Sequence, residues 1–220
     1  MTSDNFGRFV GSMSLNRLRN SNHPKAGSTT KVEPIRDLAA IATIKKNLSA
    51  RPRDLCLFTL GINTAYRANE LLSIRVGQVA HLKAGDTLDL MQSKNQRHRM
   101  ITLNSTAANA IQHWLKKHPD PEDVAPLFPS QQTRKALTVS PFINMVKGWC
   151  KDAELKGNYG SHTLRKTWGY HQLRGNTKTP PHLVLPLLME AYGHARQQQT
   201  LEYLCIQSDE VASLFMQVEL

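Results

Sequence analysis

Apolar residues recur every three or four positions over most of the chain, and this spacing predicts amphipathic helices. The first helix is expected from Glu33, with Pro34 suited to its first position. Its apolar stripe consists of Ile35, Leu38, Ile41, Ile44 and Leu48. A second helix is expected to begin near Pro52 and to end at Gly61, where its apolar run stops.

The same pattern continues to the C-terminal end, with one strand-like interruption. A loop and helix cap at 63–64 should lead into a short helix that ends at 73. Later helices are expected over 105–117, 140–149, 162–173 and 208–218, and an apolar segment that contains Pro186 leads to Tyr192. Two runs, 87–91 and 99–103, read as strands of a hairpin with a basic tip. The fold class expected is therefore mainly α with a small antiparallel β-sheet, that is, α+β.

Charge narrows the range of partners. The 220 residues include 28 Lys and Arg against 17 Asp and Glu, which gives a formal charge of +11 and a pI near 9.8. The basic residues are spread along the chain and do not lie on one amphipathic helix, so double-stranded DNA or another nucleic acid is favoured over a membrane surface. A generic basic surface is the alternative.

Cysteine usage and hydropathy favour a soluble, cytoplasmic protein. Cys56, Cys150 and Cys205 are far apart in the sequence, so neither a disulfide framework nor a zinc site is expected. The longest apolar run, 183–189, is too short to cross a bilayer and contains Pro186. No metal and no cofactor are expected.

The chain is expected to have two parts. Residues 1–32 are rich in Ser, Asn, Gly and basic side chains and should form a flexible basic N-terminal arm. This arm would either wrap DNA or remain a solvated tail. Residues 33–220 form the folded domain. The arm is too short to fold as a separate helical domain of its own.

Three segments carry candidate chemistry. The first contains Arg67 near the start of the short helix, with Glu70 one turn on and able to hold its guanidinium or the local backbone. The second is the run from His162 to Arg165, two donors one turn apart at a helix N-terminus, which also favours phosphate. The third is the Gly193-His194 turn, followed nine residues later by Tyr203.

A phenol with a pKa near ~10 is a poor nucleophile and a poor leaving group. It suits covalent chemistry in which the bond that forms is later broken by another alcohol, and it needs nearby cations. Arginine, His-x-x-Arg and Gly-His with a tyrosine nine residues on, in this order, resemble the tyrosine recombinase (phage integrase) family. The resemblance covers residues 33–220, the catalytic domain.

The resemblance implies site-specific recombination or integration by DNA strand cleavage and rejoining through a 3′-phosphotyrosyl intermediate. Tyr203 would be the nucleophile, and Arg67 and Arg165 would clamp the phosphate. His162 and His194 would donate hydrogen bonds, and His162 could also assist proton transfer from the phenol. Lys94, on the hairpin tip, would protonate the departing oxygen. The C-terminal helix would join protomers into a homo-oligomer on DNA.

Each residue also has a structural interpretation. Arg67 could be an ion-pair partner, His162 a helix cap, His194 a turn histidine, Tyr203 a buried aromatic and Lys94 part of a solvated turn. The chain departs from the family pattern in the distance of 29 residues from Arg165 to His194 and in the absence of a separate DNA-clamping domain. The alternatives are a type IB topoisomerase-like nicking and sealing enzyme and a non-catalytic DNA-binding module of the same fold.

Overall fold

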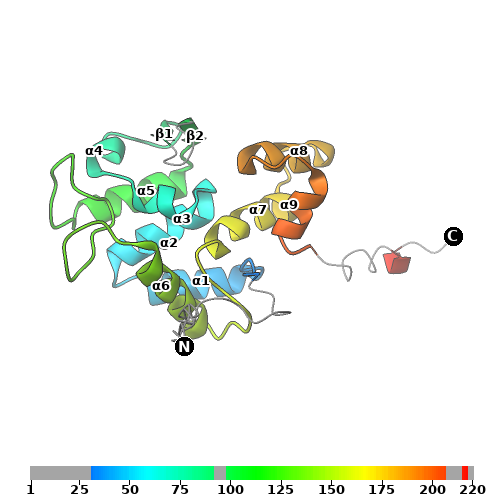
Figure 1. Ribbon diagram of the computed structural model, residues 1–220, viewed down its shortest axis with the longest axis horizontal. Helices are drawn as coiled ribbons and strands as arrows, with labels where there is room; N and C mark the ends of the chain where they lie inside the picture. Colours follow the sequence, from blue (N-terminus) through cyan, green and yellow to red (C-terminus); the bar gives the residue numbers. More distant parts are fainter. Residues whose placement is uncertain (1–30, 92–97, 207–214, 218–220) are drawn as a thin grey trace, which may run out of the picture. The chain divides into compact units, whose positions relative to one another are not determined.

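The structure is a computed structural model that describes residues 31–91, 98–206 and 215–217 (Figure 1). Within these residues the fold is mostly helical with one two-stranded sheet, which confirms the predicted class. The helices are α1 (Leu38–Asn47), α2 (Pro52–Thr64), α3 (Ala68–Leu72), α4 (Val76–Val79), α5 (Ser105–Leu115), α6 (Val139–Asp152), α7 (Thr163–Gly175), α8 (Pro181–Tyr192) and α9 (Gln197–Tyr203). The strands are β1 (Thr87–Met91) and β2 (His98–Thr102).

Helix α2 is the central element, and it packs against both α5 and α7. Its apolar run, predicted from the sequence, is completely buried at Leu57, Phe58 and Leu60. Phe58 meets the edge of Trp149 from α6 at 5.8 Å between ring centroids, so Trp149 is a core residue. We call the large group of buried side chains around α2 the main core.

A second, smaller cluster lies where α8 and α9 meet the end of α2. Its buried members are Ala65, Val184, Leu188, Tyr192 and Leu204. Three of these come from α8, which contains Pro186 and yet continues to Tyr192. Proline removes one backbone hydrogen bond early in the helix, and burial of the apolar face compensates for this loss. We call this group the second cluster.

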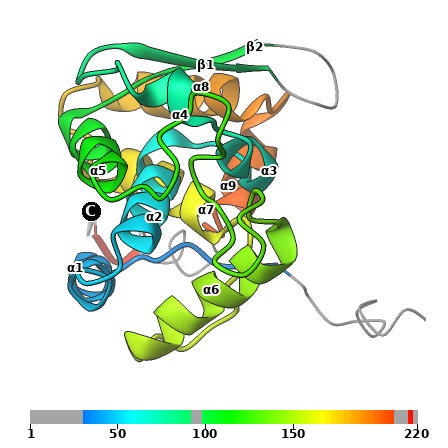
Figure 2. The same cartoon turned by 90° about the vertical axis from the view of Figure 1, so that its left-hand side faces the viewer.

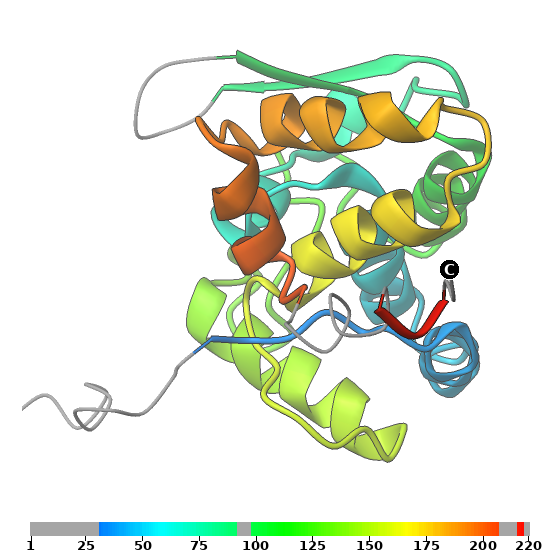
Figure 3. The same cartoon turned by 90° about the vertical axis from the view of Figure 1, so that its right-hand side faces the viewer.

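The strands pair antiparallel, with Leu88 opposite Ile101 and Leu90 opposite Arg99. The Tyr66 hydroxyl fixes the hairpin to the body by donating to the Leu88 carbonyl at 2.9 Å. The Arg99 guanidinium, on β2, donates to the carbonyl of Ala191 in α8. Figures 2 and 3 accordingly show α8 running beside the hairpin, with α6 on the other side of α2 and α7.

The predicted helix start at Glu33 is wrong. Residues 31–37 are extended, and α1 begins at Leu38 with Asp37 as its N-cap. Long-range bonds hold this segment, which we call the strap: the backbone N–H of Ile35 donates to the Thr167 hydroxyl at 2.8 Å, and Glu33 donates to the Asn158 carbonyl at 2.8 Å. Leu38, assigned to the apolar stripe, is 68% exposed.

The predicted end of α2 at Gly61 is also wrong, because the helix runs on to Thr64 and turns at Ala65, whose φ is 54°. Gly61 is a packing residue: a Cβ built there would lie 2.5 Å from Cδ1 of Leu164 in α7. The glycine therefore permits close approach of two helices and does not end one.

Other boundaries differ by small amounts. Helix α6 begins at Val139 with Thr138 as N-cap, ahead of the predicted Ser140 cap, and β2 begins one residue early. Of the expected C-terminal helix only residues 215–217 are described, and they are helical. None of the described helices is long and apolar enough to cross a membrane.

Candidate active site

Arg67 sits in the turn between α2 and α3. Ala65 adopts the left-handed conformation that redirects the chain, and Arg67 then serves as the N-cap residue of α3. The buried Glu70 carboxylate holds both parts of Arg67, accepting from its backbone N–H at 2.7 Å and from its guanidinium at 3.0 Å. The Arg67 side chain remains 44% exposed. Arg67 is therefore held at its backbone and at one guanidinium nitrogen, and its exposed side chain is still accessible to a ligand.

Arg165 lies in the first turn of α7 and is only 3% exposed. Its guanidinium donates to the carbonyl of Ala65 and, at 3.4 Å, to the carbonyl of Tyr192. Burial, together with the charge of nearby Arg99, lowers its pKa to about 10. The group therefore stays charged at neutral pH, and its charge acts in a poorly solvated setting where electrostatic effects are strong.

Tyr203, the last residue of α9, directs its hydroxyl toward His162, the N-cap residue of α7. The phenol oxygen lies 3.2 Å from His162 Nδ1, a distance at which it can donate to an unprotonated nitrogen. Burial and the charges of Arg165, Lys166 and Arg67 lower the pKa of His162, which keeps the imidazole neutral at pH 7. Burial raises the pKa of Tyr203, and the Arg165 charge opposes this effect.

His194 follows Gly193, which ends α8 in the left-handed region at φ 71°. Its Nδ1 lies 3.0 Å from the buried Thr200 hydroxyl, and its ring centroid is 5.3 Å from that of Tyr203. Burial lowers the pKa of His194, and the charges of Arg165 and Arg67 act in the same direction. If Thr200 donates to Nδ1, the neutral ring carries its proton on Nε2 and can offer it to a ligand.

The structure thus brings together five of the six predicted residues: Arg67, His162, Arg165, His194 and Tyr203. Figure 3 shows α7, α8 and α9 packed next to one another. Arg165 and Tyr203 lie on α7 and α9, His162 is the N-cap of α7, and His194 lies between α8 and α9. Lys94 lies in 92–97, outside the described residues, and its role stays a prediction. The two arginines supply positive charge, the histidines are neutral, and the phenol is protonated.

Four further side chains support this group and were not anticipated from the sequence. Arg99 reaches Glu70 at 3.8 Å, so that one carboxylate faces two arginines. Lys166 is buried, donates to the Val32 carbonyl at 2.7 Å and lies 4.9 Å from the Tyr203 ring centroid. Tyr192 and Thr200 contact Arg165 and His194 respectively. Only Thr200 had a sequence signal, because it precedes Tyr203 by three residues on one helix face.

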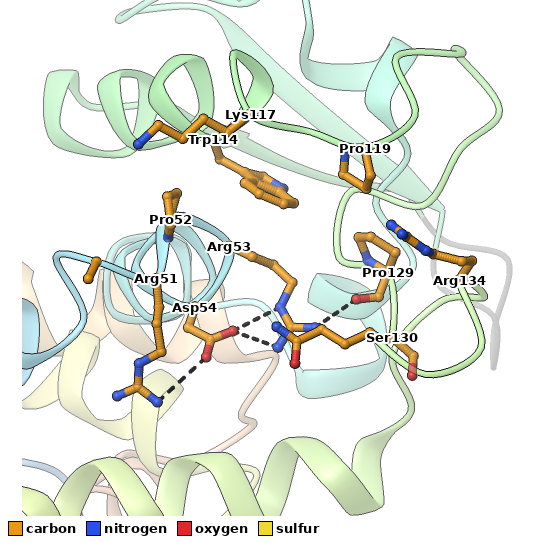
Figure 4. Close-up of a pocket in the computed structure, with 12 residues that line it drawn as sticks. Arg51, Pro52, Arg53, Asp54, Trp114, Lys117, Pro119, Pro129, Ser130 and Arg134 are labelled. Carbon is orange, nitrogen blue, oxygen red and sulfur yellow. Dashed lines mark hydrogen bonds and ion pairs between the residues drawn. The ribbon is translucent and has the colours of Figure 1, made fainter.

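Two hollows on the protein surface lie at opposite ends of α2, and they differ in how they relate to the five assembled residues. A cleft of about 740 Å³ opens beside Arg67, lined also by Arg99, Trp168 and Gly193. A hollow of about 330 Å³ lies at the other end of α2 (Figure 4). There Arg53 is engaged by the Asp54 carboxylate at 2.8 Å and by the Pro129 carbonyl at 2.8 Å. Of the five residues that the structure brings together, Arg67 lines the first cleft and none lines the second hollow.

The fold is that of a tyrosine recombinase catalytic domain. XerA recombinase matches with a TM-score of 0.64 and 16% identity, over 84% of this chain and 65% of its own. XerH site-specific recombinase, solved as a post-cleavage complex with palindromic difH substrate, matches with a TM-score of 0.62 and 21% identity, over 94% of this chain and 59% of its own.

The sequence gives the same answer. The profile of the phage integrase family matches residues 34–209, so this chain belongs to that family, whose tyrosine recombinases are DNA strand transferases. The probable integrase/recombinase YoeC of Bacillus subtilis (strain 168) is 29% identical over 185 residues, which cover 84% of this chain and 95% of that protein. The chain spans less than two thirds of the two solved recombinases.

Proposed function

We propose that this chain cleaves and rejoins DNA at specific sites through a covalent 3′-phosphotyrosyl bond to Tyr203. The observation that carries the proposal is the approach of the Tyr203 hydroxyl to within 3.2 Å of His162 Nδ1, beside the buried Arg165. A protonated phenol, a neutral base and a fixed cation are the groups that phosphoryl transfer without metal requires.

In the cleavage step the phenolic proton passes to His162 as the phenol oxygen attacks the phosphorus of the scissile phosphodiester. The bond from phosphorus to the 5′-oxygen breaks, and that oxygen leaves with a proton that we assign to Lys94. Arg67 and Arg165 each offer a fork of N–H donors to the non-bridging oxygens, where negative charge accumulates. His194 adds one further donor through Nε2.

Rejoining reverses these steps with a different alcohol. A 5′-hydroxyl of DNA attacks the phosphotyrosyl bond, the phenol leaves, and the strand is restored. Because the covalent bond retains the energy of the broken phosphodiester, the reaction needs no nucleotide cofactor. Although a phenolate is a poor leaving group in absolute terms, it leaves more readily than the alkoxide of a DNA hydroxyl, so the phosphotyrosyl bond can be broken again.

We propose double-stranded DNA as the substrate inside the cell, with residues 1–32 as a basic arm that adds phosphate contacts. We also propose that protomers assemble on DNA through the C-terminal helix. Its described residues include Phe215 and Met216, which are 82% and 83% exposed. Large apolar side chains that are this exposed are suited to burial against a second copy of the chain.

The test uses duplex DNA carrying a nick close to each candidate cleavage site, so that the cut fragment dissociates and the covalent product accumulates. We expect a denaturation-resistant protein–DNA product whose modified peptide contains Tyr203. Failure to form it on DNA that the protein binds, or its location on another residue, would refute the proposal. Joining of two different duplexes separates a recombinase from a topoisomerase-like enzyme, which relaxes one supercoiled DNA alone.

A further inference from the structure

Tyr192 is a buried tyrosine with an unusual set of contacts. It ends α8, is 1% exposed and belongs to the second cluster. Its ring centroid lies 4.7 Å from the guanidinium carbon of Arg165 and 5.0 Å from the ring of Tyr203. Aliphatic residues would fill the same space, so an aromatic here calls for a specific explanation.

Both ends of Arg165 are held by this one residue. The Tyr192 hydroxyl donates to the backbone carbonyl of Arg165 at 2.9 Å. The Tyr192 carbonyl accepts from the Arg165 guanidinium at 3.4 Å, and the face of the ring adds a cation–π contact. The main chain and the charged head of the arginine are therefore both fixed relative to Tyr192, whose side chain supplies the hydroxyl bond and the ring contact.

Gly169 makes this arrangement possible. It lies one turn after Arg165 on α7, and a Cβ built on it would lie 1.9 Å from the Tyr192 hydroxyl oxygen. That distance is far below any van der Waals contact, so a larger residue at 169 would expel the phenol from its bond to the Arg165 carbonyl. Trp168 closes the other side, with ring centroids 5.8 Å apart.

We infer that Tyr192 is a positioning residue that sets the orientation of the Arg165 guanidinium toward the scissile phosphate, and that Gly169 is its structural complement. The inference rests on the proposed function, since it assigns Arg165 to the phosphate. Rigid placement matters because the N–H donors of Arg165 must point at the non-bridging oxygens, where negative charge develops in the transition state. A small misplacement of these donors slows phosphoryl transfer strongly.

The competing interpretation is that Tyr192 is only a core aromatic. Tyr159 provides the matched control, because it is also buried and its hydroxyl donates to a backbone carbonyl, that of Lys156 at 3.1 Å. The hydroxyl of Tyr159 bonds to Lys156 and not to Arg165 or Tyr203. Removing the Tyr192 hydroxyl or the Tyr159 hydroxyl therefore deletes a similar hydrogen bond. The bond of Tyr192 lies inside the candidate site, and the bond of Tyr159 lies outside it.

The first experiment measures the rate of covalent adduct formation with Tyr192→Leu, Tyr192→Phe and Tyr159→Phe, together with DNA binding and thermal melting. We expect about a 100-fold loss of rate for Tyr192→Leu. Tyr192→Phe, which keeps the ring, should lose about fivefold, and Tyr159→Phe should stay within about twofold. DNA affinity should change little in all three. A wild-type rate in Tyr192→Leu would overturn the inference.

A second substrate distinguishes positioning from general damage. In methylphosphonate DNA one non-bridging oxygen of the scissile phosphate is replaced by a methyl group, so the linkage is neutral and depends less on an arginine. The penalty of Tyr192→Leu should shrink on this substrate, as that of Arg165→Ala should. An equal penalty on both substrates would mean that Tyr192 does not act through Arg165.

A third readout needs no activity. Protons above an aromatic face are shifted upfield, so the Arg165 Nε–H resonance, assigned by its loss in Arg165→Lys, should move downfield in Tyr192→Leu and stay in place in Tyr159→Phe. If the wild type forms no adduct, the proposed function fails, while this measurement still decides whether the Tyr192 ring holds the Arg165 guanidinium. An unchanged resonance in Tyr192→Leu contradicts it.

Discussion

The main core and the second cluster differ in size and in what they support. The main core surrounds α2 and draws buried side chains from α1, α5, α6 and the hairpin. The second cluster has five buried members and holds α8 and α9 against α7. His194 and Tyr203 belong to this thinner region, and Arg165 bridges the two. The comparison suggests that stability comes mainly from one region and the geometry of the site from the other.

Helix α7 shows how closely the two regions meet. Leu164 is buried against Gly61 in the main core, and the next residue, Arg165, points into the site. Consecutive residues on a helix are about 100° apart, so one turn can serve both regions at once. Substitutions on either side of α7 should therefore separate effects on stability from effects on chemistry.

The largest effect is expected from Tyr203→Phe, which removes only the nucleophilic oxygen. Adduct formation should disappear, while DNA affinity and the melting temperature should stay near wild type, because ring packing is almost unchanged. Gel analysis of the covalent product on nicked DNA checks this. An adduct that persists in the variant would mean that another residue is the nucleophile.

Arg165→Ala should have the next largest effect. Truncation removes a phosphate clamp, and we expect a loss of transition-state stabilisation of about 3 kcal/mol or more, some of it shared with ground-state binding. The measurement compares single-turnover cleavage rates at saturating DNA with the affinity. Arg134→Ala, at an exposed position beside the second hollow, is the control and should cleave normally.

Two glycine substitutions compare the two regions directly. Gly61→Ala places a Cβ 2.5 Å from the Leu164 side chain in the main core, and should lower the unfolding free energy by about 1–3 kcal/mol. Gly169→Ala should instead slow cleavage by displacing Tyr192. Denaturant unfolding measures the stability of both variants, and the rate of adduct formation measures their cleavage activity. Gly148→Ala, in α6 with open space around it, is the control and should be neutral or slightly stabilising.

The smallest effect is expected in the pH profile. A general base works when it is deprotonated, so cleavage at subsaturating protein should fall as the pH drops through the pKa of His162. Because that pKa is lowered from 6.5, the rate should hold below pH 6.5 before it falls. His162→Asn should be slower and lack this acid limb. A limb that remains unchanged in the variant would point to another titrating group.

The sequence was informative where chemistry demands particular residues at fixed local spacing. Arg67 with Glu70, His162 with Arg165, and His194 with Tyr203 each lie within nine residues of one another, so their relationship is visible in the chain. The mainly helical class with one hairpin followed from periodicity in the same way.

The rest depended on contacts between distant segments. The strap is extended because Ile35 bonds to Thr167, and this partner lies 132 residues away. Gly61 and Gly169 are both packing residues, and nothing local distinguishes them from a helix stop. Tyr192 has the composition of an ordinary core residue, and only its distance to Arg165 reveals a further role.

The strap also joins the two sides of the nucleophile. The Arg36 guanidinium donates to the Cys205 carbonyl at 2.7 Å, two residues beyond Tyr203, and Lys166 ties the Val32 carbonyl to the face of the Tyr203 ring. The strap and the residues that follow α9 are thus hydrogen-bonded to each other. Tension applied through either segment reaches the phenol over these few bonds, so Tyr203 is mechanically linked to both.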